Sequence, residues 1–282
     1  MKKFLLLLPL LGMQVSYAQE TVTVSKDSTW VKKGNVAILG SQSSFTNWQA
    51  GGSNNLAVNA SLNYDINYKK NDWTWDNKFI GMYGINKLKG QEKQKTDDRL
   101  EINSVVGKKA KGDWSYSYFL NFKTQFDAGL NPDSLDQRIS HFLSPAYLQT
   151  GPGMLWKKND NLKVNLSPAT ARFIFVHDHF TDFGESFGVA QGKTMRFEFG
   201  ASVNAYYKFQ VMENFTVENI LNLYSNYLED PQNVDVDYQL NAVLKVNKYI
   251  STNLTFQAVY DDNAYRGLQT RHTLGVGFNY LF

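Results

Sequence analysis

Apolar and polar residues alternate along most of the chain with a period of two. From Leu56 to Tyr68 every even position is apolar, while the odd positions from Asn59 onward carry Asn, Ser or Asp. Successive side chains of a β-strand point to opposite faces, so this pattern predicts a strand of about 13 residues with one apolar and one polar face. The mean strand of soluble proteins has only about 5–6 residues.

Eight further segments repeat this alternation, and three more show it less clearly. Of the weaker three, 36–48 is expected to be the first strand, 146–157 contains Pro152, which cannot donate to a ladder, and 162–177 loses its register near Pro168. The sequence therefore predicts twelve strands in all. The clear segments are 56–68, 73–85, 99–106, 114–127, 195–209, 215–227, 236–246, 253–260 and 274–282.

The length of these segments distinguishes a membrane barrel from a soluble sandwich. About 9–11 tilted residues cross a bilayer as a strand, and nearly all the segments reach that length. A closed barrel satisfies every backbone hydrogen bond, as hydrocarbon requires, and it meets lipid with its apolar face. Bacterial single-chain barrels have even strand numbers, which fits twelve and leaves ten or fourteen as alternatives. The predicted fold is an all-β, closed antiparallel transmembrane β-barrel.

The connections between the strands fall into a short and a long class. If the last strand ends at the periplasmic side, the turns there are short and the outer loops mostly longer, as in outer-membrane barrels. Trp73, Trp75, Trp114 and Trp156 lie beside the short turns and predict an aromatic girdle at that interface. The predicted periplasmic turns are 69–72, 108–113, 157–161, 212–214 and 247–250, and the predicted outer loops are 49–55, 86–98, 127–145, 177–193, 228–234 and 261–269.

The first eighteen residues have a different character. Lys2 and Lys3 precede an apolar run from Phe4 to Leu11, and Ser16-Tyr17-Ala18 has the small-x-small form of a cleavage site. This arrangement predicts a secretory signal peptide, because a spanning helix needs about 20 apolar residues. The predicted organisation is a cleaved signal peptide at 1–18, a periplasmic segment at 19–34 and the outer-membrane barrel at 35–282.

Composition excludes several classes of function. The chain has no cysteine, which excludes disulfides, cysteine-ligated zinc and a thiol nucleophile. Removal of Lys2 and Lys3 with the signal peptide lowers the formal charge from +3 to +1, so nothing indicates nucleic acid as a partner. Aromatic residues make up 15% of the chain although the mean hydropathy is −0.40, which suits sheets with one apolar and one polar face.

The chain ends on Phe282 after Phe278 and Tyr280, which resembles the C-terminal signal read by the outer-membrane barrel assembly machinery. Several longer stretches also resemble an uncharacterised family of Bacteroidota outer-membrane β-barrel proteins, known only as a domain of unknown function. The resemblance implies a barrel and an outer-membrane location, and it implies no activity or site residues. Its stretches are Phe45-Thr46-Asn47-Trp48 with Gly51-Gly52, Phe122 to Phe126, Ser140 to Tyr147, Ser225 to Asp235, and Tyr260-Asp261-Asp262.

His177-Asp178-His179 is the most suggestive cluster for metal binding. On a strand the two histidines share one face and form a pair of metal ligands, with Asp182 or Glu185 as a third. The alternative is a polar stretch where a strand becomes a long outer loop.

A membrane-embedded serine hydrolase is a second chemical hypothesis. It requires a serine and a histidine base within hydrogen-bond reach, and the chain has histidines at 141, 177, 179 and 272. No nucleophile-elbow motif supports it. We therefore expect no catalytic residue and no cofactor.

Charged residues on the polar faces are expected to line the lumen, where a charge must be paired or hydrated. Their signs are mixed, which suits a locked barrel or a narrow wet pore. The expected lumen residues are Asp65, Asp76, Lys78, Glu101, Lys123, Arg196, Glu198, Lys208, Glu218 and Lys245. An acidic group is expected at the outer mouth, where it could favour cations or bridge divalent ions to lipopolysaccharide, or simply form a solvated rim: Asp127, Asp235, Asp237 and Asp261.

The sequence thus favours a narrow pore or passive channel for small solutes. The first alternative is a non-conducting structural or accessory subunit whose loops at 127–145 and 177–193 bind surface partners, and the hydrolase is the second. The expected partners are outer-membrane lipid, lipopolysaccharide, the assembly machinery at Phe282 and surface proteins.

Overall fold

The computed structural model describes residues 29–44, 54–131, 134–263 and 265–282. The predicted signal peptide, most of the predicted periplasmic segment and Trp48 lie outside the described residues. The described residues contain no helix that is both long enough and apolar enough to cross a membrane.

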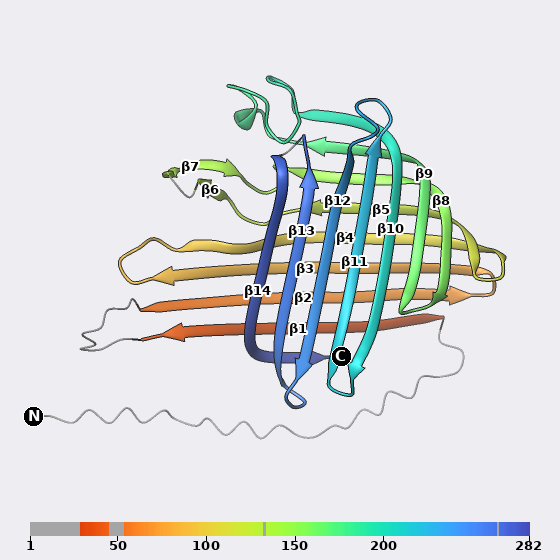
Figure 1. The fold of residues 1–282 in the computed structure, drawn as a ribbon, viewed down its shortest axis with the longest axis horizontal. Helices are drawn as coiled ribbons and strands as arrows, with labels where there is room; N and C mark the ends of the chain where they lie inside the picture. The colour runs from red at the N-terminus through yellow and green to blue at the C-terminus, as the bar shows by residue number, and fades with distance from the viewer. Residues whose placement is uncertain (1–28, 45–53, 132–133, 264) are drawn as a thin grey trace, which may run out of the picture.

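Twelve antiparallel strands close into one barrel, as the sequence predicts (Figure 1). Each strand pairs with its neighbours in chain order, except that a small two-stranded sheet of β6 (Gly129–Asn131) and β7 (Ser134–Ser140) separates β5 from β8. The barrel strands are β1 (Trp30–Ser43), β2 (Asn55–Lys70), β3 (Trp73–Leu88), β4 (Gln94–Lys111), β5 (Trp114–Thr124), β8 (Ala146–Asn159), β9 (Leu162–Phe175), β10 (Met195–Met212), β11 (Phe215–Asn226), β12 (Val234–Lys245), β13 (Ile250–Asp261) and β14 (Tyr265–Leu281).

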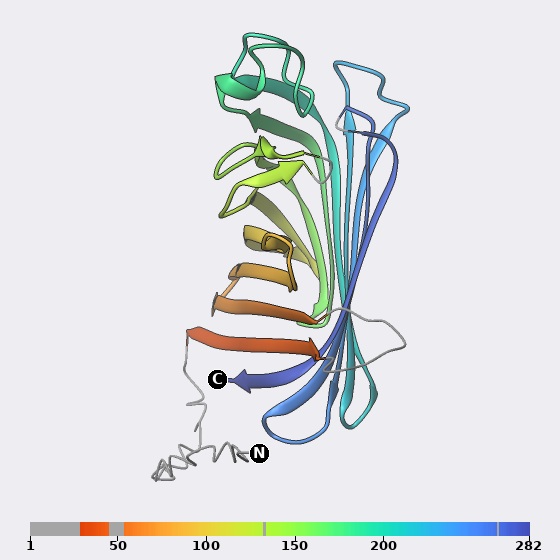
Figure 2. The same ribbon diagram turned by 90° about the vertical axis from the view of Figure 1, so that its left-hand side faces the viewer.

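The barrel is flattened into two walls. Strands β1 to β5 form one wall and β10 to β14 the other, and the strands of the two walls cross in projection (Figure 1). Figure 2 shows the walls side by side, with β8 and β9 turning from one to the other. Flattening brings inward side chains of one wall close to those of the other, which decides the chemistry of the interior.

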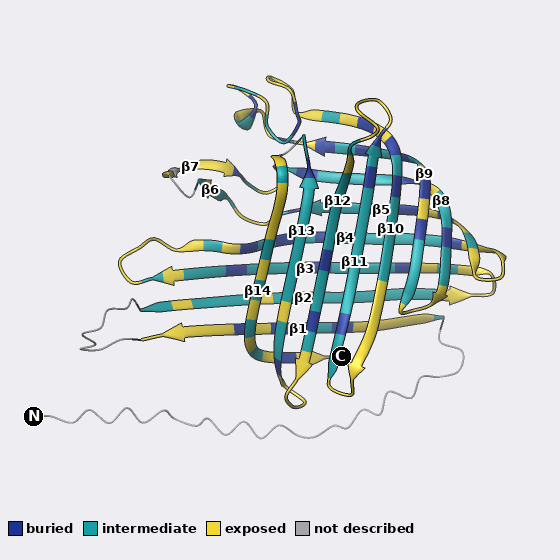
Figure 3. Ribbon diagram, in the orientation of Figure 1, coloured by how far each residue is buried: buried dark blue, intermediate teal, exposed yellow. Residues whose placement is uncertain are grey.

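The two faces of the strands differ as the alternation requires. Large apolar side chains such as Ile38, Leu62 and Phe197 are exposed on the outside, while charged residues such as Glu101 and Glu198 are buried inside. Figure 3 shows buried positions separated by intermediate or exposed ones along strands such as β3, β4 and β10. Since hydrocarbon requires paired backbone groups and the ladders of a closed barrel supply most of these pairs, this polarity identifies a transmembrane β-barrel.

The aromatic girdle includes a residue that the sequence analysis missed. Trp73, Trp75 and Trp114 are exposed beside the short turns. Trp30 joins them, with its ring 5.0 Å from that of Tyr68 and 5.9 Å from that of Trp75. The first strand therefore begins at Trp30, before the predicted start at residue 36, and its pairing with β2 runs through Lys32 and Lys33, whose charges obscured the alternation.

The third weak segment, β9, contains an irregularity. Asn165 and Ser167 are buried at odd positions, whereas Thr170 and Arg172 are buried at even ones. The pairings of β9 with β8 and β10 both shift in register in this region. An extra residue exchanges the two faces of a strand, which explains why the alternation fails near Pro168.

The outer loops differ in length from the prediction. Strands β3 and β4 extend to Leu88 and from Gln94, so the expected loop at 86–98 is mostly strand. The expected loop at 261–269 is likewise shortened, because β14 begins at Tyr265. The 127–145 region holds the β6–β7 sheet.

The barrel closes where β1 meets β14 in a short seam. Only Asn35–Gly40 of β1 pairs with Val276–Leu281 of β14, and Gly34 and Phe282 add two backbone hydrogen bonds at its inner end. A side chain at Gly277 would place its Cβ 2.1 Å from the carbonyl oxygen of Ile38, so this close approach requires glycine. Within the described residues, Tyr265–Gly275 of β14 pairs with β13 alone.

The cost of placing a charged side chain on the outward face should depend on its depth in the membrane. We expect Leu62→Arg, in the middle of β2, to lower the free energy of unfolding by about 2–4 kcal/mol, because the guanidinium meets hydrocarbon. The control Leu56→Arg, near the outer end of the same face, should cost about 0–1 kcal/mol. Denaturant titration of the barrel folded into lipid vesicles measures both, and equal small costs would indicate that this face meets water.

Candidate functional site in the barrel interior

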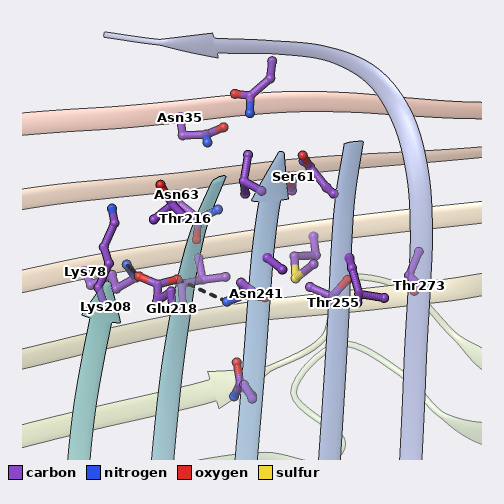
Figure 4. A pocket seen from close by; sticks show the side chains of 18 of the residues that line it. Asn35, Ser61, Asn63, Lys78, Lys208, Thr216, Glu218, Asn241, Thr255 and Thr273 are labelled. Carbon is purple, nitrogen blue, oxygen red and sulfur yellow. Dashed lines mark hydrogen bonds and ion pairs between the residues drawn. The ribbon is translucent and has the colours of Figure 1, made fainter. Parts of the chain in front are cut away.

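A cavity of about 310 Å³ lies in the inner half of the lumen, which we call the inner chamber. Amide and hydroxyl side chains from both walls of the barrel line this chamber, among them Asn63, Asn241 and Thr255 (Figure 4). These side chains point inward because they occupy the polar positions of their strands. The chamber therefore offers many hydrogen-bond donors and acceptors beside apolar groups such as Ile80 and Met82.

One ion pair spans this chamber. The Nζ atom of Lys78, on β3, lies 3.1 Å from Oε1 of Glu218, on β11, and 3.7 Å from Oδ1 of Asp65. Glu218 also accepts hydrogen bonds from the hydroxyl of Tyr206, at 2.8 Å, and from the amide of Asn241, at 3.2 Å. Glu218 is thus held by groups from both walls, which ties β3 to β11.

A layer of polar side chains separates the inner chamber from the outer half of the lumen, and we call it the bridging layer. Arg99 donates from Nε to Glu101 at 2.8 Å and from Nη1 to Gln239 of the opposite wall at 2.6 Å. Lys123 forms an ion pair with Asp237 across the lumen. The bridging layer therefore joins β4 and β5 to β12.

A second connection reaches β14. Arg271 forms an ion pair with Asp97 of β4 and donates to Gln257 at 2.9 Å. Gln257 in turn donates to Asp237 at 2.8 Å, so this connection continues into the bridging layer. Nearer the short turns, Asp76 lies 2.9 Å from Lys157 and 3.1 Å from Lys163, which ties β3 to β8 and β9.

A cavity of about 250 Å³, the outer chamber, lies beyond the bridging layer. Arg172 lies at its wall, with Nη2 2.8 Å from Asp261, Nη1 3.5 Å from Glu198, and an ion pair to Asp235. The guanidinium also lies against the rings of Tyr147 and Tyr224, 5.5 and 5.0 Å from their centroids. One cation thus neutralises carboxylates from three strands.

Seven of the ten expected lumen residues line the two chambers, and the other three form ion pairs. Asp65, Lys78, Lys208, Glu218 and Lys245 line the inner chamber. The remaining five belong to the outer half or to the interior ion pairs: Glu101 and Lys123 line the outer chamber, and Asp76, Arg196 and Glu198 form salt bridges.

The four expected acidic residues do not form one ring. Asp235, Asp237 and Asp261 line the outer chamber, each paired with Arg172 or Lys123. Asp127 lies apart from them after the end of β5. There it accepts hydrogen bonds from the hydroxyl of Tyr83 and the backbone N–H of Ala128, which hold the pKa of its carboxyl below the ordinary value.

The histidines are placed differently from the expectation. His177 and His179 do not lie on a strand, because β9 ends at Phe175 and residues 178–180 form a single turn of 3-10 helix, η1 (Asp178–Phe180). Nδ1 of His177 lies 2.6 Å from Asp178 and accepts the backbone N–H of His179. Neither Asp182 nor Glu185 joins them in a metal-ligand group within the described chain.

Carboxylates form one group with metal-ligand spacing among the described residues. Oxygen atoms of Asp235, Asp261 and Asp262 lie within 4.8 Å of one another. Arg172 already neutralises Asp235 and Asp261, and Asp262 accepts a hydrogen bond from Asn233. Nor does a serine hydroxyl form a hydrogen bond with a histidine ring within the described residues; His141 instead lies 2.7 Å from the carbonyl oxygen of Phe142.

Sequence reasoning missed the three arginines that organise the interior. Arg99 lies on the polar face of the predicted strand at 99–106, and alternation with Leu100 predicts that it points inward. It was nevertheless not among the expected lumen residues. Arg271 falls between the predicted outer loop at 261–269 and the predicted strand at 274–282, in a stretch that β14 includes. Arg172 follows the irregularity of β9, so its face does not follow from alternation counted from the start of the strand.

Comparisons with known proteins concern the fold. Residues 41–130 match the model of a protein family of unknown function, DUF3078. No curated protein matches the chain in sequence. The COG4313 outer membrane channel from Pseudomonas putida F1 has 9% identity and a TM-score of 0.41, covering 92% of this chain and 100% of its own.

Two further solved structures are similar at the same level. The NanC porin has 9% identity and a TM-score of 0.38, covering 87% of this chain and 98% of its own. The outer membrane channel DcaP of Acinetobacter baumannii has 10% identity and a TM-score of 0.33, covering 90% and 95%.

Arg172 should be essential for stability. We expect Arg172→Met to lower the free energy of unfolding by about 3–5 kcal/mol, because Glu198, Asp235 and Asp261 lose their shared cation. The control Arg266→Met, at an exposed position of β14, should change it by less than about 0.5 kcal/mol. Denaturant titration in vesicles measures both, and a stable Arg172→Met barrel would show that the carboxylates need no cation.

Proposed function

We propose that this barrel is a narrow outer-membrane channel for small polar solutes. The observation that carries the proposal is the presence of two polar chambers, separated only by side chains of the bridging layer. Eight strands just fill with side chains and sixteen leave a channel, so a twelve-stranded barrel lies between the two, and the two chambers favour a passage. The proposal includes a Bacteroidota source for this outer-membrane protein, which the sequence resemblance supports.

The bridging layer is proposed to set the size of the passage. Gln239 reaches across from β12 to accept from Arg99 of β4, and Lys123 meets Asp237 in the same layer. This layer consists of side chains alone, and side chains change rotamer far faster than backbone segments rearrange. Such a constriction favours solutes with polar groups of their own, because these groups replace the hydrogen bonds between bridging-layer side chains that the solute breaks as it passes.

A non-conducting accessory role is the second candidate, and the outer loops support it. The segment at 176–194 packs on the end of β9 through Ile174, Val176 and Val189. It also meets the 125–145 segment, with the rings of His141 and Phe180 5.0 Å apart. Phe183 is 94% exposed in this region, an apolar side chain suited to a surface protein partner.

Planar-bilayer recordings of the purified barrel test the channel. We expect discrete conductance steps, and a larger conductance for Gln239→Ala, because this variant removes one side of the bridging layer without leaving a charge unpaired. The matched control Gln210→Ala removes a glutamine that bonds to Glu213 at the inner turn, and it should leave conductance unchanged.

The result that contradicts the channel is equally plain. If wild type and Gln239→Ala both show no steps at high voltage while remaining folded, the lumen is closed and the accessory role is favoured. We would then expect the purified barrel to bind a surface protein and the Phe183→Ser variant to lose that binding.

A further inference from the structure

The inner chamber carries an excess of positive charge. Six basic side chains line it, against two acidic ones. Among the basic residues, Lys33, Lys208 and Lys245 form no salt bridge within the described part of the chain. They lie near the inner end of the barrel, on β1, β10 and β12.

The carboxylates of the chamber are already engaged. Lys208 lies opposite Glu218 in the strand register, and Lys33 lies opposite Asp65. Lys78, however, forms ion pairs with both carboxylates. The opposite position to Lys245 is Ser251, which carries no charge. The three lysines are therefore left without an anionic partner among the residues that the structure describes.

The other two cations of the chamber have partners in the walls. Arg99 is bonded to Glu101, and Arg271 is paired with Asp97. These arginines therefore fix the walls and leave the lysines to meet a solute. An ammonium group on a flexible stem suits this task, because it adjusts to the position of an anion.

The remaining lining indicates what the anion carries. Asparagine and threonine side chains from both walls line the same chamber as the lysines, among them Asn35, Asn63 and Thr216 (Figure 4). Amides and hydroxyls bind the hydroxyl groups of a solute by donating and accepting at once. The cavity of about 310 Å³ lies at the lower end of the range for small-molecule sites.

The outer chamber has the opposite sign. Glu101, Asp235, Asp237 and Asp261 line it together with only two cations, Lys123 and Arg172. An anion is therefore disfavoured there and favoured in the inner chamber, so the lumen is polarised along its length. The inner end is the favourable side for an anion to enter.

We infer that the inner chamber binds a small polyhydroxylated carboxylate, of the size of a sugar acid, through Lys33, Lys208 and Lys245. This inference names the substrate class of the proposed channel and rests on that function for its biological meaning, although binding is measured without conduction. The carboxylate meets the lysine ammonium groups, and its hydroxyls meet the surrounding amides.

Calorimetric titration of the full barrel in detergent tests the site, with D-glucuronate as the probe. D-glucose and D-glucosamine serve as the neutral and cationic comparisons. We expect glucuronate to bind at least about tenfold more tightly than glucose, since one charge-assisted hydrogen bond is worth this much. Lys208→Gln/Lys245→Gln should lose about tenfold or more in affinity for glucuronate, and Lys70→Gln, at an inner turn outside the chamber, should lose none.

The outcomes separate this inference from the channel. Binding of glucuronate with no conductance would support the site and overturn the channel. Conductance with equal affinities for glucuronate and glucose, or with no loss in the double lysine variant, would overturn the site and leave the channel. Heat-dependent migration in electrophoresis confirms that each variant is folded, and Lys33→Gln alone provides a milder second test.

Discussion

The interior of this barrel depends on the rule that a charge removed from bulk water must meet a partner. The flattened shape places two walls close enough for that partner to come from the opposite side. Lys78 meets Glu218, Lys123 meets Asp237, and Arg99 reaches Gln239, in each case between strands far apart in sequence. Backbone pairing alone would allow a round cylinder as readily as a flat one, and these contacts favour the flat form.

Two of these contacts divide the lumen. Arg99 with Gln239 and Lys123 with Asp237 lie between the chambers, so a cavity remains on each side of them, and the two cavities differ in the sign of their excess charge. Structure and selectivity thus share one set of side chains. The residues that hold the walls are fully engaged, and those that are left free are available to a solute.

The alternation of the sequence was sufficient to predict the closed barrel, its twelve strands and its short inner turns, because period two is a local property of each strand. It failed at β9, where an irregularity near Pro168 exchanges the faces, and at β1, where Lys32 and Lys33 hide the early start. The alternation within one strand predicts whether a side chain points inward. The identity of its ion-pair partner depends on the register of strands that are distant in sequence. For that reason Lys78 was predicted to face the lumen while its pairing with Glu218 was not.

The seam between β1 and β14 has a consequence for how the wall comes apart. In the described chain β1 and β14 are joined only from Gly34 to Gly40, whereas β2 and β3 are joined from Asn55 to Lys70. Beyond Gly40 the two strands separate, and the edge of β14 from Tyr265 to Gly275 is free of β1 in the described chain. We therefore expect β1 and β14 to separate first at the outer end of the seam. The last contact to break is the one at the inner end, where the ring of Phe282 lies over Gly34.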